Sequence, residues 1–315
     1  MRATTAPVLS RWSPASPAGH AVAAAVIAVA LASCSLLVDT SNLSGEADDS
    51  GSGSDGGDGG GPQDADAAGD QSVPGDAAMG YAAVVMATGP LAYFRFDEPA
   101  GSKTVSSSVG TFSGSFTRGV VLGTPSPIGR DPTNTGATFS TPGSLDSDLS
   151  LGQYFTFEGN KPFSIEVWLN PSIVDASSRH VVAKADRGSQ GPLNGWSLVL
   201  GQIPQPVAWF ERGFFGDGGT GAKSFAPIST GSFAHVVQVY DGSALLIYVN
   251  GVAFAAPTPM TTPNPVSAAP AFVGSANGGQ SNGHGYVGVL DELAIYDKAL
   301  NQAQVTAHFQ AGKPQ

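Results

Sequence analysis

The chain has 315 residues with 42 Gly and 23 Pro, and only 12% are charged, a mixture that favours short strands joined by turns over helices, which Gly and Pro weaken or break. The net charge of −11 is uneven: residues 41–75 hold eight acids and no Lys or Arg, whereas residues 76–315 hold sixteen acids against twelve bases. Because no basic stripe exists, the sequence disfavours nucleic-acid binding, which needs clustered Lys and Arg to displace counterions from phosphates.

The first 33 residues have the pattern of an export signal. Arg2 and Arg11 provide positive charge, and residues 21–32 form an uncharged apolar stretch. That stretch is shorter than the roughly 20 residues that span a bilayer, but it has the length of the apolar region of a signal peptide. We therefore predict a signal peptide over residues 1–33.

The chain has one cysteine, Cys34, which cannot form an intramolecular disulfide. The tetrapeptide Leu31-Ala32-Ser33-Cys34 resembles the lipobox of bacterial lipoproteins. This resemblance implies that Cys34 becomes the acylated first residue of the mature protein and anchors it to a membrane, since each buried CH₂ contributes about 0.8 kcal/mol of membrane affinity. It also implies a place in the cell envelope, and Ser35 is compatible with the outer membrane, facing the periplasm or the surface. The alternative is an ordinary cleaved signal peptide with an incidental cysteine.

Residues 34–77 are expected to be a disordered linker behind the lipidated N-terminus. Its Gly, Asp, Ser and Ala residues, without an aromatic residue in 41–75, cannot bury enough apolar surface to offset the entropy lost on ordering. Its like charges repel and extend it. We interpret the segment as an acidic spacer between the membrane and a folded domain.

Residues 78–315 are predicted to form one all-β domain. In Phe163–Leu169 every second residue is apolar, the period of a half-buried strand. Asn250-Gly251 between apolar residues is a strong hairpin signal, because both residues adopt positive φ. The predicted strands are Leu91–Asp97, Gly119–Leu122, Tyr154–Phe157, Phe163–Leu169, His180–Lys184, Trp196–Leu200, Val207–Glu211, Ala234–Tyr240, Ala244–Val249, Ala271–Gly274 and Tyr286–Tyr296.

The one predicted helix lies near the end of the chain. Asn301 is suited to cap it, and Leu300, Val305 and Phe309 give a short apolar stripe. Many closely spaced strands with almost no helix indicate a two-sheet antiparallel sandwich.

Four blocks in this region resemble the LamG-like jellyroll domains of the concanavalin A-like lectin/glucanase superfamily. The blocks are residues 90–101, an opening strand; 162–168, a core strand; 233–251, a hairpin; and 288–300, a closing strand and turn. The resemblance implies a concanavalin A-like jellyroll sandwich across nearly all of residues 79–312. The sequence departs from the family pattern at Phe233, where a Trp is usual, and at Ser106, where an Asp is frequent.

Some members of this superfamily are glucanases, and an enzyme of that kind would need a pair of catalytic acids. Glycoside hydrolysis needs two carboxylates about 5–9 Å apart. Glu166 has no acid two residues away, and Asp291 and Glu292 are adjacent, which on a regular strand directs them to opposite faces. The scattered histidines show no metal-binding spacing, and His235 is interpreted as structural. We therefore expect no enzymatic activity and keep an unusual glycosidase as the last alternative.

The family resemblance implies a calcium site, because related domains often hold Ca²⁺ near the rim of the sandwich. Carboxylates are ligands that this cation prefers. The candidates are Asp97, Glu98, Asp291 and Glu292, since the first and last strands commonly pair in this architecture. Turn-capping or hydrogen-bonding roles for these four acids are the alternative.

A glycan site would need exposed aromatic rings and polar side chains, since sugars stack on ring faces. The candidate ligand-binding residues lie around a Gly-rich loop and are Trp209, Phe214, Phe215 and Asp217. Core packing is the alternative for the rings. The sequence thus predicts an envelope-anchored binding module for a polysaccharide or glycosylated ligand. The other hypothesis is adhesion to a cell-surface protein, or a structural role without a sugar site.

Overall fold

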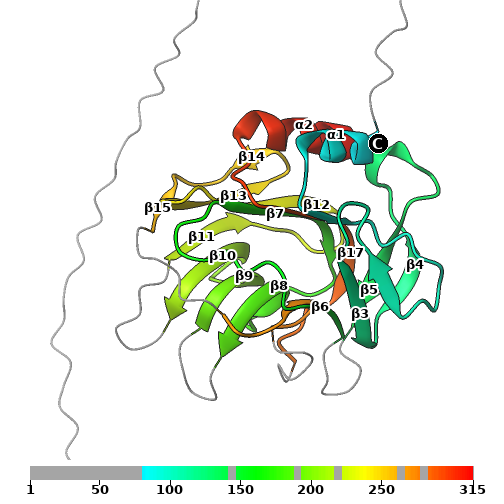
Figure 1. Ribbon diagram of the computed structural model, residues 1–315, viewed down its shortest axis with the longest axis horizontal. Helices are drawn as coiled ribbons and strands as arrows, with labels where there is room; N and C mark the ends of the chain where they lie inside the picture. Colours follow the sequence, from blue (N-terminus) through cyan, green and yellow to red (C-terminus); the bar gives the residue numbers. More distant parts are fainter. Residues whose placement is uncertain are drawn as a thin grey trace, which may run out of the picture. The chain divides into compact units, whose positions relative to one another are not determined.

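The computed structural model describes residues 80–140, 147–187, 193–215, 222–260, 267–276 and 283–314, all within the unit Asp70–Gln315. The prediction of a two-sheet antiparallel sandwich is confirmed (Figure 1). Within this described part, no helix has the length and apolar character needed to cross a membrane.

The first sheet has nine strands in the order β14-β13-β12-β7-β17-β5-β4, with β1 paired to β17 and β15 paired to β13. Its strands are β1 (Ala92–Phe94), β4 (Val121–Pro125), β5 (Thr135–Phe139), β7 (Phe163–Pro171), β12 (Ala234–Tyr240), β13 (Ala244–Val249), β14 (Val252–Ala253), β15 (Thr258–Pro259) and β17 (Gly288–Tyr296). The pairing of β1 with β17 confirms that the first and last long segments of the domain lie side by side.

The second sheet has eight strands in the order β11-β10-β9-β8-β16-β6-β3-β2. Its strands are β2 (Thr104–Ser106), β3 (Ser113–Arg118), β6 (Asp148–Gly152), β8 (Arg179–Arg187), β9 (Leu193–Gln202), β10 (Pro206–Phe215), β11 (Ala222–Pro227) and β16 (Ala271–Val273). The main core lies between the two sheets and contains Phe163, Ile165, Trp196 and Phe210, all almost inaccessible to solvent.

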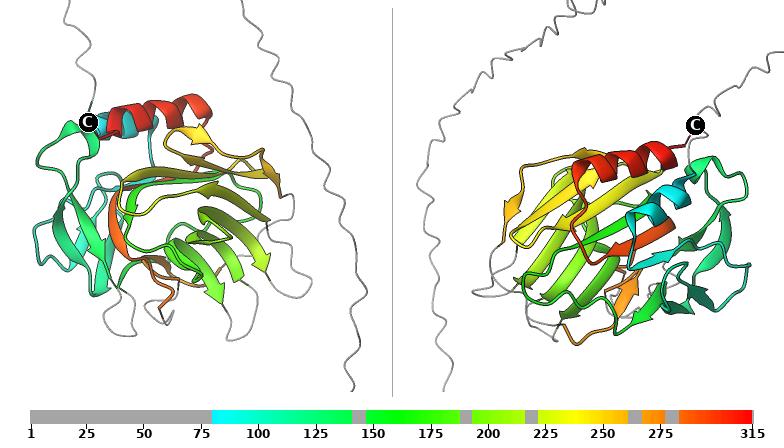
Figure 2. Two further views of the ribbon diagram at one scale, coloured as in Figure 1. Left: turned by 180° about the vertical axis from the view of Figure 1, so that it is seen from behind. Right: turned by 45° about the horizontal axis from the view of Figure 1, so that its top comes forward.

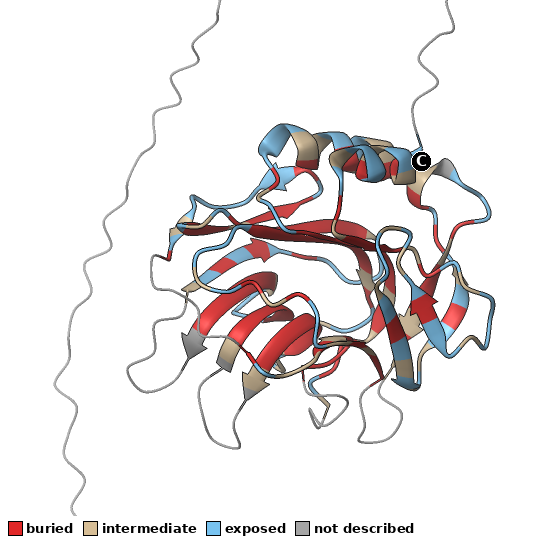
Figure 3. Ribbon diagram, in the orientation of Figure 1, coloured by how far each residue is buried: buried red, intermediate tan, exposed pale blue. Residues whose placement is uncertain are grey.

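Two helices, α1 (Tyr81–Thr88) and α2 (Gln302–Gly312), cover the outer face of the first sheet, and a 3-10 turn, η1 (Ile128–Arg130), adjoins them (Figure 2). Below the helices lies a second apolar cluster that includes Tyr81, Trp168 and Val305. Figure 3 shows the same arrangement as buried strands beneath helices whose outer surfaces are exposed. Strand β7 is therefore buried on both faces, and the prediction that this strand is half-buried is wrong because the helical layer covers its second face.

The C-terminal helix begins as predicted. Asn301 Oδ1 accepts from the Gln304 backbone N–H at 2.9 Å, and Gln304 Oε1 accepts from the Asn301 N–H at 3.0 Å. This reciprocal capping box pairs two backbone groups at the helix start. By contrast, α1 was not predicted, because its apolar run has no polar face to mark a helical period.

The hairpin at Asn250-Gly251 is confirmed, with φ angles of 52° and 80°. The strand predicted over Tyr154–Phe157 is wrong: this segment has no strand pairing, and Phe155 has a φ of 63°. Phe155 and Phe157 are nevertheless buried in the main core. The alternation of apolar residues in this segment therefore arises from a loop whose side chains enter the core.

Candidate functional site

A polar recess of about 490 Å³ opens beside the end of β1. It is formed by the segment after β1, by β4, and by the loop that leads into β5. Its lining residues are Arg95, Asp97, Glu98, Pro99, Ala100, Gly123, Asp131, Thr133 and Thr135. We name it the polar recess.

Arg95 organises this recess through two acids. Its Nη2 lies 3.0 Å from Asp97 Oδ2, and its Nε lies 3.5 Å from Glu292 Oε1. Asp97 also accepts from the Thr135 backbone N–H at 3.2 Å. These contacts join the loop after β1 to β5 and β17, so that charges distant in sequence meet at one place.

The loop before β5 supplies a second fixed acid. Asp131 Oδ1 accepts from the Thr133 N–H at 2.9 Å and from the Thr133 hydroxyl at 2.6 Å. Hydrogen bonds from Thr133 hold the pKa of Asp131 below its usual range. The carboxylate therefore stays ionised and oriented at the entrance of the recess.

The buried wall behind Arg95 contains Asp291 and Glu292. Relative to β7, strand β17 has one extra residue between Asp291 and Ala294, and Glu292 has a φ of 55°. The prediction that the two acids point to opposite faces is wrong, because this bulge breaks the alternation of the strand. Burial raises the pKa of Glu292 to about 7 against the opposing effects of Tyr93 and Arg95. Burial and the neighbouring Glu292 raise the pKa of Asp291 well above its usual range.

The four predicted calcium ligands do not converge on one position. Glu98 Oε1 accepts from the Ser106 N–H at 2.9 Å, whereas Asp97 and Glu292 both pair with Arg95. Across the described residues, no three His, Cys, Asp or Glu side chains form a group that could hold a metal ion. Arg95 supplies positive charge where a cation would be needed, so these side chains fit an arginine better than calcium. Calcium binding stays a prediction from the sequence that these contacts do not support.

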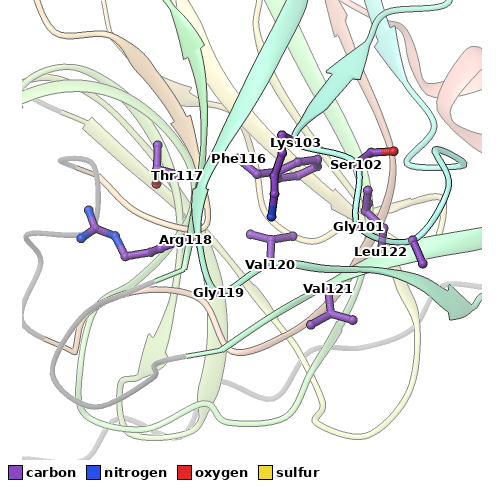
Figure 4. A pocket seen from close by; sticks show the side chains of 11 residues that line it. Gly101, Ser102, Lys103, Phe116, Thr117, Arg118, Gly119, Val120, Val121 and Leu122 are labelled. Atoms are coloured by element: carbon purple, nitrogen blue, oxygen red, sulfur yellow. The ribbon is translucent and has the colours of Figure 1, made fainter.

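A second recess, of about 410 Å³, adjoins the polar recess and is lined by residues 100–103 and 116–122. We name it the lysine recess. Figure 4 shows the side chains of Lys103, Phe116 and Val120 near one another in this recess, while the Arg118 side chain points away from these three. Arg118 lies 3.7 Å from the buried carboxylate of Asp148.

Of the predicted glycan-binding residues, the side chain of Trp209 alone is described. It is 3% exposed, and its Nε1 donates to Glu211 Oε2 at 3.0 Å. Its ring lies against Gly201, and Lys223 Nζ is 5.4 Å from the ring centroid. Trp209 therefore presents no open ring face for a sugar, and these contacts favour the packing alternative for it.

The other predicted residues lie outside what the structure describes. The backbone of Phe214 and Phe215 continues β10 opposite β9, but their side chains, and Asp217 as a whole, are outside the described residues. Cys34 is outside them too. Their predicted roles stay predictions.

A third group of titratable residues surrounds Glu166, under the two helices. Glu166 Oε1 accepts from the Tyr81 hydroxyl at 2.8 Å and from His235 Nε2 at 2.7 Å. Glu166 Oε2 accepts from the Tyr296 hydroxyl at 2.8 Å and from His308 Nδ1 at 2.9 Å. Glu166 and both histidines are 0% exposed, so this carboxylate is closed to a substrate and acts as a structural centre. The interpretation of His235 as structural agrees with these contacts.

Sequence reasoning missed the contribution of Arg95, Asp131, Thr133 and Thr135. Arg95 lies within residues 90–101, where the resemblance to the family's opening strand accounts for the sequence without a functional role. The run from Asp131 to Thr135 has the Asp-x-Thr pattern of a side-chain-capped turn. That signal could have identified a fixed polar loop, but only the pairing of β5 with β17 places it near Arg95.

Comparisons with known proteins agree with this architecture. The model of the Laminin_G_3 family, described as the concanavalin A-like lectin/glucanases superfamily, matches residues 142–306. A search of curated proteins found no match.

Solved structures resemble the chain at low identity. The binding domain of botulinum neurotoxin serotype G has a TM-score of 0.52 at 11% identity, covering 70% of this chain and 50% of that one. A botulinum neurotoxin type C structure, described by interaction with two ganglioside molecules, has a TM-score of 0.51 at 11% identity, covering 71% and 52%. Domain 4 of AbnA, a GH43 extracellular arabinanase from Geobacillus stearothermophilus in complex with arabinotriose, has a TM-score of 0.48 at 19% identity, covering 69% and 96%. The chain spans about half the length of the neurotoxin domains, and these likenesses concern the fold alone.

Proposed function

We propose that this chain, which belongs to the concanavalin A-like lectin/glucanases superfamily, is a binding module that holds a saccharide in its polar recess. The observation that carries the proposal is the set of polar groups around that recess, at a volume of about 490 Å³. Ligand sites typically enclose about 300–1,000 Å³ with a few fixed polar groups.

The chemistry of the lining suits a polyhydroxylated ligand. Asp97, Glu98 and Asp131 provide acceptors, Arg95 provides donors, and the hydroxyl of Thr135 can do both. Neighbouring sugar hydroxyls present alternating donors and acceptors that such a set can pair with. The fold is compatible with this role, because the neurotoxin type C relative is described by its interaction with gangliosides, which carry sugars.

We expect an Asp97→Asn variant to lose at least tenfold in affinity for the saccharides that the wild-type chain binds on a glycan array. The substitution removes the negative charge that pairs with Arg95 and that strengthens hydrogen bonds from sugar hydroxyls, and a hydrogen bond to a charged group contributes about 1.5–3 kcal/mol. Asp297→Asn is the matched control, because Asp297 is exposed and does not line the recess.

Three results would count against the proposal. An array without saccharide hits would leave adhesion to a protein as the remaining hypothesis. Equal loss in both variants would place the site elsewhere. Release of reducing sugar from any bound glycan would revive the glycosidase alternative.

We also propose that the mature protein is anchored in the cell envelope through acylated Cys34. The support is the lipobox resemblance around the single cysteine. Cells fed a clickable palmitate analogue are expected to label the wild-type chain and to leave Cys34→Ser unlabelled. Cys34→Ala provides a second check, since both variants should accumulate with an uncleaved leader. A wild-type chain that takes up no label would eliminate the anchor and leave the binding proposal intact.

A further inference from the structure

The polar recess and the lysine recess share a border made of very small residues. Ala100 lines both, and Gly123 lines the polar recess beside Leu122 of the lysine recess. A Cβ placed on Gly123 would lie 3.9 Å from Ala100 Cβ, and both residues are exposed. The two recesses therefore meet at a border to which small residues, Ala100 and Gly123, contribute.

The two recesses differ in charge. Asp97, Glu98 and Asp131 line the polar recess with one base, Arg95, which already pairs with two acids. The lysine recess is lined entirely by described residues, and none of them is an acid. Lys103 is exposed and makes no ion pair with any residue in the described part of the chain. An anionic group is thus repelled on one side of Ala100 and attracted on the other.

The lysine recess also contains an apolar surface next to Lys103. Phe116 is partly buried against the core, and its side chain lies beside Lys103 and Val120 (Figure 4). A sugar ring packs its C–H face against an aromatic ring, as amphipathic groups do at binding sites. The Lys103 ammonium, next to the Phe116 ring, could then pair with a carboxylate carried by the same sugar.

We infer that the two recesses form one groove for an acidic oligosaccharide, with a carboxylate-bearing sugar over Phe116 facing Lys103 and an uncharged sugar in the polar recess. This inference rests on the proposed function and specifies its ligand. It predicts a preference for chains in which uronic acid and neutral sugars alternate. The charge difference across Ala100 sets the register of such a chain, that is, which sugar lies in which recess.

Titration calorimetry of the intact chain tests the inference with a hyaluronan tetrasaccharide and its carboxyl-reduced form. We expect wild-type protein to bind the acidic probe about three- to tenfold more tightly, the range for one partly exposed charge-assisted hydrogen bond. Lys103→Gln should bring the acidic probe to the affinity of the reduced one and leave the reduced probe unchanged. Lys161→Gln is the control, since Lys161 is exposed and lines neither recess.

A second variant tests whether the recesses act together. Ala100→Leu places a larger side chain on the border that both recesses share, so it should weaken the tetrasaccharide several-fold and weaken glucuronic acid alone, which occupies a single recess, by less. Equal binding of both probes by the wild type, or an unchanged preference in Lys103→Gln, would overturn the inference while leaving a neutral-glycan function standing. If neither probe binds and the array shows no saccharide, the inference and the proposed function both fail.

Discussion

Replacing Glu166 by Gln is expected to lower the free energy of unfolding by about 3–5 kcal/mol, the effect of removing one partner from a buried, hydrogen-bonded charge network. For a domain of this size such a loss corresponds to a melting temperature lower by about 10 °C. The network joins β7, β12, β17 and both helices. The amide of Gln has nearly the volume of the Glu166 carboxyl group. Its N–H₂ group, however, would face hydroxyl and imidazole groups that donate to Glu166, so two donors would oppose each other.

The ionised carboxylate is what the surrounding side chains require. A carboxylate accepts only, and every contact of Glu166 comes from a hydroxyl or an imidazole nitrogen that can donate. Burial by itself raises the pKa of Glu166, but hydrogen bonds and charge from His235 and His308 outweigh it and hold the pKa well below the usual range. Because the unfolded chain binds this proton more readily, the contribution is present above about pH 4.5 and is lost as the pH falls below it.

Thermal melting followed by circular dichroism between pH 3 and pH 8 measures both effects. Glu158→Gln is the control, since Glu158 is exposed and surface substitutions usually change stability by less than about 0.5 kcal/mol. A Glu166→Gln protein as stable as this control would show that the network does not hold the helices on the sheet.

Replacing Glu292 by Gln is expected to reduce the loss of stability that the wild type shows between pH 4.5 and pH 7.5. Burial raises the pKa of Glu292 to about 7. The folded protein therefore retains a proton that the unfolded chain releases near pH 4.3, so increasing pH favours unfolding. The wild type should lose on the order of 2 kcal/mol between pH 4.5 and 7. The variant should lose less, because the neutral amide does not titrate and because it relieves the repulsion on Asp291.

Urea unfolding at pH 4.5, 6 and 7.5 measures this dependence without heating. Glu166 and Glu292 act in opposite directions, so wild-type stability should pass through a maximum at mildly acidic pH. Parallel pH profiles for the wild type and Glu292→Gln would show that Arg95 and Tyr93 keep Glu292 ionised in the folded protein.

The sandwich could be predicted because its central strands are continuous runs rich in apolar residues between turn residues. Ala234–Tyr240 and Ala244–Val249 were predicted with the bounds that β12 and β13 have. Strands near the edges, such as β2 and β3, have exposed, polar residues at alternate positions. Short polar segments of this kind resemble loops until a neighbouring strand pairs with them.

The helical layer could not be predicted in full. The capping residues Asn301 and Gln304 identify the start of α2 from the local sequence. Helix α1 has no capping side chain, and it is stabilised by packing of Tyr81 against Trp168 and Gly312. Glu166 was recognised as a solitary acid on its strand. Its four partners come from positions 69 to 142 residues away, and no local pattern reports such contacts.

The site was predicted only in part. Asp97 and Glu98 were identified through the family resemblance and do line the polar recess. Asp291 and Glu292 lie behind the recess in its buried wall, because a one-residue bulge turns both toward β1 and β5. A shift of this kind depends on the register between strands, which alternation along one strand cannot reveal.

Hydrogen–deuterium exchange of the intact chain, with and without the strongest saccharide from the array, tests most directly where a ligand is held. A saccharide bound between the polar and lysine recesses will slow exchange in residues 95–103 and 116–135. Slowing confined to β9, β10 and β11, where Trp209 lies, with those loops unchanged, would contradict the site described here.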